Sequence, residues 1–196
     1  MKFISLLCRL EDKRVVLATQ SPRRIELLRS VGLEFEIYPP RIEEKLRPGV
    51  SPVEYVRHNA GEKANWVSQH VNYDLIISAD TVVTLNDKIF EKPDNVSQAE
   101  AMLRELSNQT HQVITGFCLR SPSRQITDHE ITRVTFYPLS EEEIHTYLQS
   151  DEPFDKAGAY GIQGFASLFI RHIEGCYFNV VGFPLGKFYQ RLKSFF

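Results

Sequence analysis

The sequence predicts an α/β protein built around a mixed β-sheet. Strand-like apolar runs alternate with segments of helical periodicity along the chain. Two pairs of strand-like runs read as antiparallel hairpins, so the expected sheet is not purely parallel. The chain has 196 residues, of which 42% are hydrophobic and 24% charged. A chain of this size can bury a substantial core, and it forms one large domain or one domain in two lobes.

The expected strands follow from apolar and β-branched runs separated by turn-type residues. In chain order they are 14–19, 34–38, 74–79, 82–85 with 89–90, 111–120, 125–137 and 167–173. Asn86-Asp87-Lys88 supplies the turn between the fourth run and its partner. The runs 111–120 and 125–137 form the second expected hairpin.

The expected helices begin at residues that suit N-terminal caps. Ser21 precedes Pro22 and a helix that ends before Gly32, while Ser51 and Glu54 form a capping box for a helix to about Gln69. Capping sequences at 97–100 and 140–143 open two further helices, the first of which reaches about residue 106. The chain after Pro184 predicts a final amphipathic helix.

Charge and composition narrow the classes of function. The formal net charge of -2 argues against a general nucleic-acid binder, and no apolar run is long enough to span a membrane. Cys8, Cys118 and Cys176 lack metal-ligand spacing and suit a reducing cytoplasm. Residues 1–12 are short, partly charged and without a clear cleavage site. They are expected to be an extra N-terminal segment before a single domain at 13–196.

The first candidate site lies at the start of the helix that Ser21 caps. Arg23 and Arg24 occupy its first turn, where acidic residues are the usual choice. Free N–H groups, the helix dipole and two guanidinium groups together favour an anion, most naturally phosphate. The same residues also fit a solvated basic turn on a surface helix.

Carboxylates and lysines supply the second group of candidates. Asp80 directly follows an apolar strand, at the end where α/β sheets usually bind ligands, although an Asp there also commonly caps a turn. Glu43 and Glu44 lie in a polar loop, and near Asp80 they could hold Mg²⁺ or Mn²⁺. Lys63 lies within an expected helix, where a surface ion pair is its ordinary role. Lys92 precedes a proline, which holds it extended toward a cleft or in a plain loop.

A third candidate is the segment 155–164, with three glycines in seven residues. Glycine allows the backbone to approach a ligand closely, and Gly161 and Gly164 would leave room for a base. Gln163 carries both a donor and an acceptor for a base edge. A turn-rich crossover between lobes is the alternative. The sequence contains no GxxxxGK[ST], GxGxxG, HExxH or GxSxG pattern.

Taken together, the motifs resemble those of the Maf family of nucleoside triphosphate pyrophosphatases. They are LATQSPRRIELL, SADTVVTL, EKPD, LSNQTHQVITG, DEPFDKAGAYGIQG and NVVGFPLGKF, in family order from about residue 14 to 188. The resemblance implies a two-lobed fold similar to inosine-triphosphate pyrophosphatases, with the substrate in a cleft between the lobes. Pro22 directly before Arg23, Glu91 before Lys92, and Ile162-Gln163 before Gly164 resemble the dTTP/UTP branch.

The resemblance also implies the activity and the role of each candidate residue. It implies an enzyme that hydrolyses dTTP and UTP to the monophosphate and pyrophosphate, clearing non-standard or excess nucleotides with the help of Mg²⁺ or Mn²⁺. Asp80 would accept the proton or hold the metal, and Glu44 would help to hold the metal. The expected substrate contacts are Ser21, Arg23, Arg24, Lys63, Thr81, Lys92 and Gln163.

Partners and alternatives follow from the same resemblance. It implies a homodimer that takes a nucleoside triphosphate. The net charge and the lack of a long apolar run predict no nucleic-acid or membrane partner, and the cysteines predict a cytoplasmic location. Two other functions stay open. One is a pyrophosphatase that acts mainly on modified nucleotides such as 7-methyl-GTP. The other is a non-catalytic regulator of cell division, to which the family is also linked.

Overall fold

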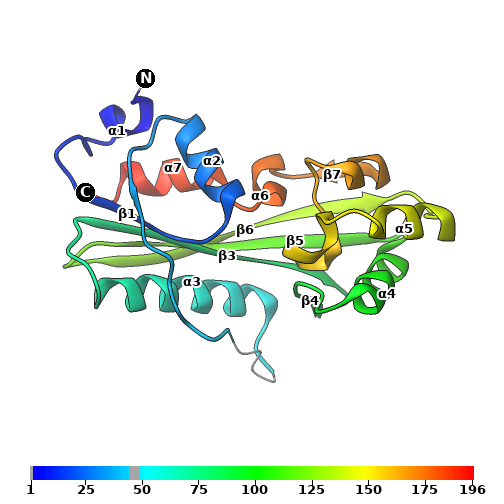
Figure 1. The fold of residues 1–196 in the computed structure, drawn as a ribbon. Coiled ribbons are helices and arrows are strands. Elements are labelled where there is room, and N and C mark those ends of the chain that lie inside the picture. The colour runs from blue at the N-terminus through cyan, green and yellow to red at the C-terminus, as the bar shows by residue number, and fades with distance from the viewer. Residues whose placement is uncertain (1, 45–48) are drawn as a thin grey trace. The chain divides into compact units, whose positions relative to one another are not determined.

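The computed structural model describes residues 2–44 and 49–196. Within these ranges seven strands form one sheet in the order β2-β1-β3-β5-β6-β7, with β4 paired to β3 (Figure 1). Strand β1 runs parallel to both β2 and β3, whereas β4 is antiparallel to β3 and β7 is antiparallel to β6. The predicted mixed α/β fold is therefore confirmed.

The strands are β1 (Val15–Ala18), β2 (Glu36–Ile37), β3 (Leu75–Leu85), β4 (Lys88–Phe90), β5 (Thr110–Arg120), β6 (Gln125–Phe136) and β7 (Ile170–Glu174). The α-helices are α1 (Phe3–Leu7), α2 (Pro22–Ser30), α3 (Pro52–Ser68), α4 (Val96–Leu106), α5 (Glu141–Leu148), α6 (Tyr177–Val181) and α7 (Leu185–Lys193). Three 3-10 turns cover Glu152–Asp155, Ala157–Ala159 and Phe165–Phe169. None of the helices in the described ranges is long and apolar enough to cross a bilayer.

The chain forms two compact units. Unit 1 comprises Met1–Asp80, Thr115–Glu130 and Gly182–Phe196, and unit 2 comprises Thr81–Ile114 and Ile131–Val181. The boundary falls inside the long strands β3, β5 and β6, so each of these strands contributes to both units.

In unit 1, helices cover both faces of the sheet. Helix α3 lies on one face, and α2 and α7 lie on the other (Figure 1). The α3 side is packed with small and β-branched residues: Val16, Ala18, Ala60, Ala64, Val67, Ile76 and Cys118. A Cβ atom at Gly116 of β5 would lie 2.5 Å from the backbone carbonyl of Val56. Only glycine therefore lets α3 approach this strand so closely.

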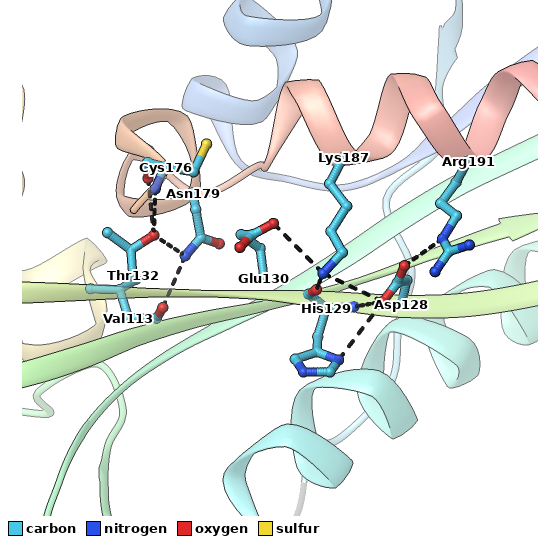
Figure 2. Close-up of polar contacts among 9 residues, drawn as sticks. All are labelled: Val113, Asp128, His129, Glu130, Thr132, Cys176, Asn179, Lys187 and Arg191. Carbon is cyan, nitrogen blue, oxygen red and sulfur yellow. Dashed lines mark hydrogen bonds and ion pairs between the residues drawn. The ribbon is translucent and has the colours of Figure 1, made fainter. Parts of the chain in front are cut away.

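Helix α7 is joined to β6 by a set of charged groups (Figure 2). The Nε of Arg191 donates to Oδ2 of Asp128 at 2.5 Å, and Nζ of Lys187 donates to the carbonyl of His129 at 2.6 Å. Burial raises the pKa of Asp128, but the Arg191 hydrogen bond and neighbouring positive charges outweigh it and lower that pKa overall. These contacts fix the C-terminal helix on unit 1.

In unit 2, helices α4 and α5 pack together over an apolar core that includes Phe136, Tyr147 and Phe169. Helix α6 is joined to β6 through Asn179, whose Nδ2 donates to the carbonyl of Val113 at 2.9 Å and to Oγ1 of Thr132 at 3.0 Å (Figure 2). Asn179 and Thr132 are both fully buried.

The strand expectations need three corrections. Strand β3 continues through Asp80 to Leu85, because its apolar pattern resumes at Val82, so Asp80 lies inside a strand and not at its end. The expected strand at 34–38 shrinks to the two residues of β2, both exposed at the sheet edge. The expected strand at 167–173 starts instead at Ile170, since a 3-10 turn occupies 165–169.

The helix predictions are close to the structure. The capping boxes at Ser51 and Ser140 are both present, and Ser21 caps α2. Helix α4 begins earlier than expected because the side chain of Asn95, and not Ser97, accepts from the backbone N–H of Gln98 at 2.9 Å.

The N-terminal segment 2–12 is folded onto unit 1. Its α1 buries Ile4 and Ser5, and Leu10 is also buried. The hydroxyl of Ser5 donates to the carbonyl of Gly32 at 3.3 Å and accepts from the N–H of Glu34 at 3.1 Å. That this segment is an addition to a domain at 13–196 stays a prediction.

Candidate functional site

The N-terminus of α2 has the predicted local structure. The hydroxyl of Ser21 accepts from the backbone N–H of Arg24 at 3.5 Å, and Oγ1 of Thr19 accepts from the N–H of Ser21 at 3.1 Å. The first turn carries no acidic side chain. The Nε of Arg24 donates to the carbonyl of Gly182 at 2.9 Å, which holds the guanidinium against the loop before α7.

Electrostatics places Arg24 among the other candidates of unit 1. Desolvation lowers the pKa of Arg24, the negative charges of Asp80 and Glu44 oppose that change, and Arg23 adds to it. Arginine keeps its proton at any physiological pH. The structure therefore brings a permanent positive charge within electrostatic reach of both predicted acidic ligands.

Asp80 is the centre of the site in unit 1. It lies in the middle of β3 and is only 6% exposed. From α3, Nζ of Lys63 donates to Oδ1 of Asp80 at 2.8 Å, and Nδ2 of Asn59 donates to Oδ2 at 2.9 Å. Asn59 and Lys63 are one helical turn apart, so their side chains lie on the same face of α3. Together they bind both oxygens of the carboxylate.

This environment keeps Asp80 ionised. Burial raises the pKa of a carboxyl group, but here the charge and hydrogen bond of Lys63, the Asn59 amide and the charge of Arg24 more than offset it, so the pKa of Asp80 is below its usual value. A buried, ionised carboxylate needs such partners to be tolerated at all.

Glu44 joins the same group from the loop before α3. Its Oε1 lies 2.9 Å from Nζ of Lys63, so the Lys63 ammonium sits between the carboxylates of Glu44 and Asp80. Two carboxylates that converge on one cation are hard oxygen donors of the kind that Mg²⁺ and Mn²⁺ prefer. The donor set therefore fits a divalent cation. Glu43 lies in the described range next to Glu44 and is exposed.

Three predicted site residues belong to unit 2. Thr81 is partly buried on β3, directly after Asp80, while Lys92 and Gln163 are exposed. Their side chains therefore belong to a different compact unit from Arg23, Lys63 and Asp80. Their part in a substrate site stays a prediction.

The glycine-rich segment of unit 2 corrects one expectation. A Cβ atom at Gly164 would lie 2.1 Å from Oε2 of Glu152, and one at Gly161 would lie 2.6 Å from the Lys156 side chain. The space beside these glycines is thus filled by the protein itself and is not left open for a base. Glu152 is held there because it accepts from the N–H of Phe165 at 2.8 Å and from the hydroxyl of Tyr147 at 3.1 Å.

Sequence reasoning missed Asn59 and Glu152. A signal existed for Asn59, since a polar residue four positions before Lys63 shares its helix face. Its neighbours on that face, Ala60 and Ala64, are small and buried, which marks the face as the inner one. Glu152 had no such signal, because its contacts are made with the chain beyond residue 160 and with Tyr147.

Fold and site define an α/β protein with positive charges gathered round a buried, ionised carboxylate. Residues 14–195 match the family described as "Maf-like protein". The chain is 43% identical over 183 residues to a dTTP/UTP pyrophosphatase of Bacillus cereus (strain ATCC 10987 / NRS 248), covering 93% of this chain and 90% of that protein. The same identity and share of this chain hold for the dTTP/UTP pyrophosphatase of Bacillus mycoides (strain KBAB4), of which 96% is covered. The chain belongs to the Maf family.

Among solved structures, the Ham1 protein of Staphylococcus aureus is similar with a TM-score of 0.46 and 15% sequence identity. That match covers 63% of this chain and 72% of the Ham1 chain.

Proposed function

We propose that this protein hydrolyses dTTP and UTP to the nucleoside monophosphate and pyrophosphate. The observation that carries the proposal is the buried, ionised Asp80, bound by Lys63 and lying in the field of Arg24. Relatives that are 43% identical over 93% of the chain are named dTTP/UTP pyrophosphatase, which supports the proposal.

The positive groups of unit 1 match the charge of a triphosphate. Arg23 and Arg24 occupy the first turn of α2, where the helix dipole adds to their attraction for an anion. When pyrophosphate leaves, negative charge grows on it, and guanidinium and ammonium groups fixed beforehand stabilise that charge in the transition state. We assign this role to Arg23, Arg24 and Lys63, with Lys92 as a further phosphate contact.

Asp80 is assigned to the attacking water. An ionised carboxylate can accept a hydrogen bond from water, align it with the α-phosphate and take its proton. The lowered pKa of Asp80 keeps it ionised, so that it can orient the water, accept its proton or bind a cation.

A divalent cation belongs to this proposal. Glu44 and Asp80 would hold Mg²⁺ or Mn²⁺, which when bound neutralises phosphate charge and polarises the P–O bonds. For that, Lys63 would give up its place between the two carboxylates and turn toward a phosphate oxygen. The long, flexible lysine side chain suits such an exchange.

Base recognition is assigned to unit 2. The exposed carboxamide of Gln163 can donate to a carbonyl and accept from the N3–H of uracil or thymine. The C5 methyl of thymine changes discrimination by only about 1–3 kcal/mol, so one site can serve both dTTP and UTP. Thr81 is a second specificity position, and Ser21 supports the phosphate end through its cap.

The proposal extends to the setting of the enzyme. We propose that the enzyme is a cytoplasmic homodimer. It binds a nucleoside triphosphate as its substrate, and neither a nucleic acid nor a membrane is its partner. The free thiols of Cys8, Cys118 and Cys176 suit the reducing cytoplasm.

A product-resolved assay tests the function. Purified protein with Mg²⁺ or Mn²⁺ should release pyrophosphate from dTTP and UTP, and EDTA should abolish the reaction. Orthophosphate with a diphosphate product would refute the assigned bond, and full activity in EDTA would refute the metal. A preference for 7-methyl-GTP over UTP in the same screen would move the enzyme to the modified-nucleotide branch, and no turnover of any triphosphate would favour a binding protein.

A further inference from the structure

Asn59 donates an uncharged hydrogen bond to the Asp80 carboxylate, beside the charged one from Lys63. It is 4% exposed, and its Nδ2 lies 2.9 Å from Oδ2 of Asp80. Helix α3 presents it one turn before Lys63, which binds the other oxygen, Oδ1. The two donors therefore act on different oxygens of the same carboxylate, from one rigid element.

The two donors differ in what they do to the charge. Lys63 neutralises Asp80, and its ammonium is also shared with Glu44 at 2.9 Å and with the carbonyl of Ala79 at 3.3 Å. Asn59 brings no charge, so it orients the carboxylate and leaves its negative charge available to a cation. Its short side chain has two rotatable bonds and is fixed by burial.

We propose that Asn59 is a positioning residue, which holds the plane of the Asp80 carboxylate with Oδ1 turned toward Glu44 when Lys63 moves to a phosphate. This inference rests on the proposed function and deepens it. Loss of a hydrogen bond from a neutral group to a metal-binding side chain typically lowers metal affinity or activity 10- to 100-fold.

The alternative is that Asn59 only fills the interior and satisfies its own amide. Substitution would then lower stability and leave the chemistry of folded protein unchanged. The proposal instead requires a loss in the rate constant and in cation affinity that persists in folded protein. The KM for UTP should change little, because Asn59 faces Asp80 and not a phosphate-binding arginine.

The experiment compares Asn59→Leu with Asn65→Leu. Leucine keeps the branched skeleton of asparagine, with two methyl groups in place of the amide oxygen and nitrogen, and so lacks the donor. Asn65 is a partly exposed residue of the same helix outside the proposed machinery. We expect kcat for UTP to fall about 10- to 100-fold in Asn59→Leu, with KM within about threefold of wild type, and Mn²⁺ affinity measured by electron paramagnetic resonance to fall about tenfold. Asn65→Leu should match wild type in all three quantities.

Asn59→Ser keeps a polar group, but its side chain is too short to reach Asp80. If the leucine variant does not fold, the serine variant tests whether Asn59 positions Asp80. Folded Asn59 variants that keep kcat and Mn²⁺ affinity within twofold of Asn65→Leu would overturn the inference. If the wild-type protein releases no pyrophosphate, the proposed function is wrong, and the Mn²⁺ affinities alone then test the role of Asn59. Equal Mn²⁺ affinities in wild type and Asn59→Leu would overturn that role.

Discussion

The two units each bury an ionisable group, and they stabilise it in opposite ways. In unit 1, Asp80 keeps its charge because Lys63 and Asn59 bind its two oxygens. In unit 2, His111 of β5 is 1% exposed, and burial lowers its pKa to about 3, so it is neutral at physiological pH. Its Nε2 lies 2.7 Å from the hydroxyl of Tyr160, and its ring meets Phe136 edge to face at 4.9 Å between centroids.

The difference shows what each unit uses a polar group for. A buried charge is costly and adds little net stability compared with apolar packing, so its retention in unit 1 points to chemistry. A neutral imidazole among aromatic rings, with one hydroxyl partner, costs much less and packs like an apolar group. On this view, substitutions in unit 1 should mainly affect activity and charge pairing, and those at His111 should affect the pH dependence of stability.

The largest expected effect follows from removing the charge of Asp80. Asp80→Asn keeps the size of the side chain but loses the base and most of the affinity for a cation. We expect the rate of UTP hydrolysis to fall about 10²- to 10⁴-fold, the span of a lost general base. Steady-state kinetics with confirmation of the fold by circular dichroism measures this, and near-normal turnover would show that Asp80 is not the reactive group.

The second effect is on stability. Lys63→Met removes the cation from a pair whose side chains are 9% and 8% exposed. Breaking a buried pair on one side should lower the free energy of unfolding by about 3–5 kcal/mol, because the carboxylate stays buried without its charge partner. Urea unfolding at pH 7 provides the measurement.

The double variant tests the reason for that loss. Asp80→Asn combined with Lys63→Met leaves no buried charge in this pair, so it should be more stable than the sum of the two single losses predicts. Strict additivity would mean that the two groups do not interact appreciably in solution.

The third effect concerns His111 and pH. Its pKa is about 3 in the folded protein and near 6.5 in an unfolded chain. Between these values the unfolded state binds a proton that the folded state does not, so stability falls as the pH falls from about 6.5 toward 3. At about 1.4 kcal/mol per pH unit, the contribution lost by pH 4.5 is about 2–3 kcal/mol.

His111→Phe should remove this part of the pH dependence, at the cost of the hydrogen bond to Tyr160. The exposed His172 of β7 supplies a control in the same unit, and His172→Phe should keep the wild-type slope. The test is to measure the free energies of unfolding of all three proteins at several pH values between 4.5 and 7. Equal slopes for wild type and His111→Phe would mean that the imidazole is not buried neutral.

The smallest effect is expected at the surface of unit 2. Arg104 of α4 contacts Glu141 and Glu100 at 2.6 Å each, but its side chain is exposed and solvent screens the pair. Arg104→Ala should shift Tm by no more than about 2 °C. A shift of the size caused by Lys63→Met would contradict the contrast between buried and exposed pairs.

Much of the fold could be predicted from local signals. Capping residues such as Ser21, Ser51 and Ser140 define helix starts through contacts with the next few residues, which a sequence displays directly. The continuation of β3 through Asp80 could not be predicted in this way, because a charged residue inside a strand is tolerated only when a distant helix supplies its partners.

The candidate site was likewise predictable only where its contacts are local in sequence. The arginines after Ser21 were visible as a pattern within one helix turn, whereas the pairing of Asp80 with Asn59 joins residues 21 positions apart. The side chains that pack on Gly161 and Gly164 were likewise invisible, since glycine-rich sequence looks the same whether its open side meets a ligand or Glu152.

Gly116 sets a limit on how this protein can vary. The missing side chain at this position fixes the spacing between α3 and the sheet, with the Val56 carbonyl 2.5 Å from where a Cβ atom would lie. Asparagine is short, and from α3 it reaches β3 only because that spacing is small. Any residue other than glycine at 116 would force the helix outward and leave a longer gap to Asp80. The hydrogen bond between Asn59 and Asp80 therefore depends on a third residue, which takes no part in the bond itself.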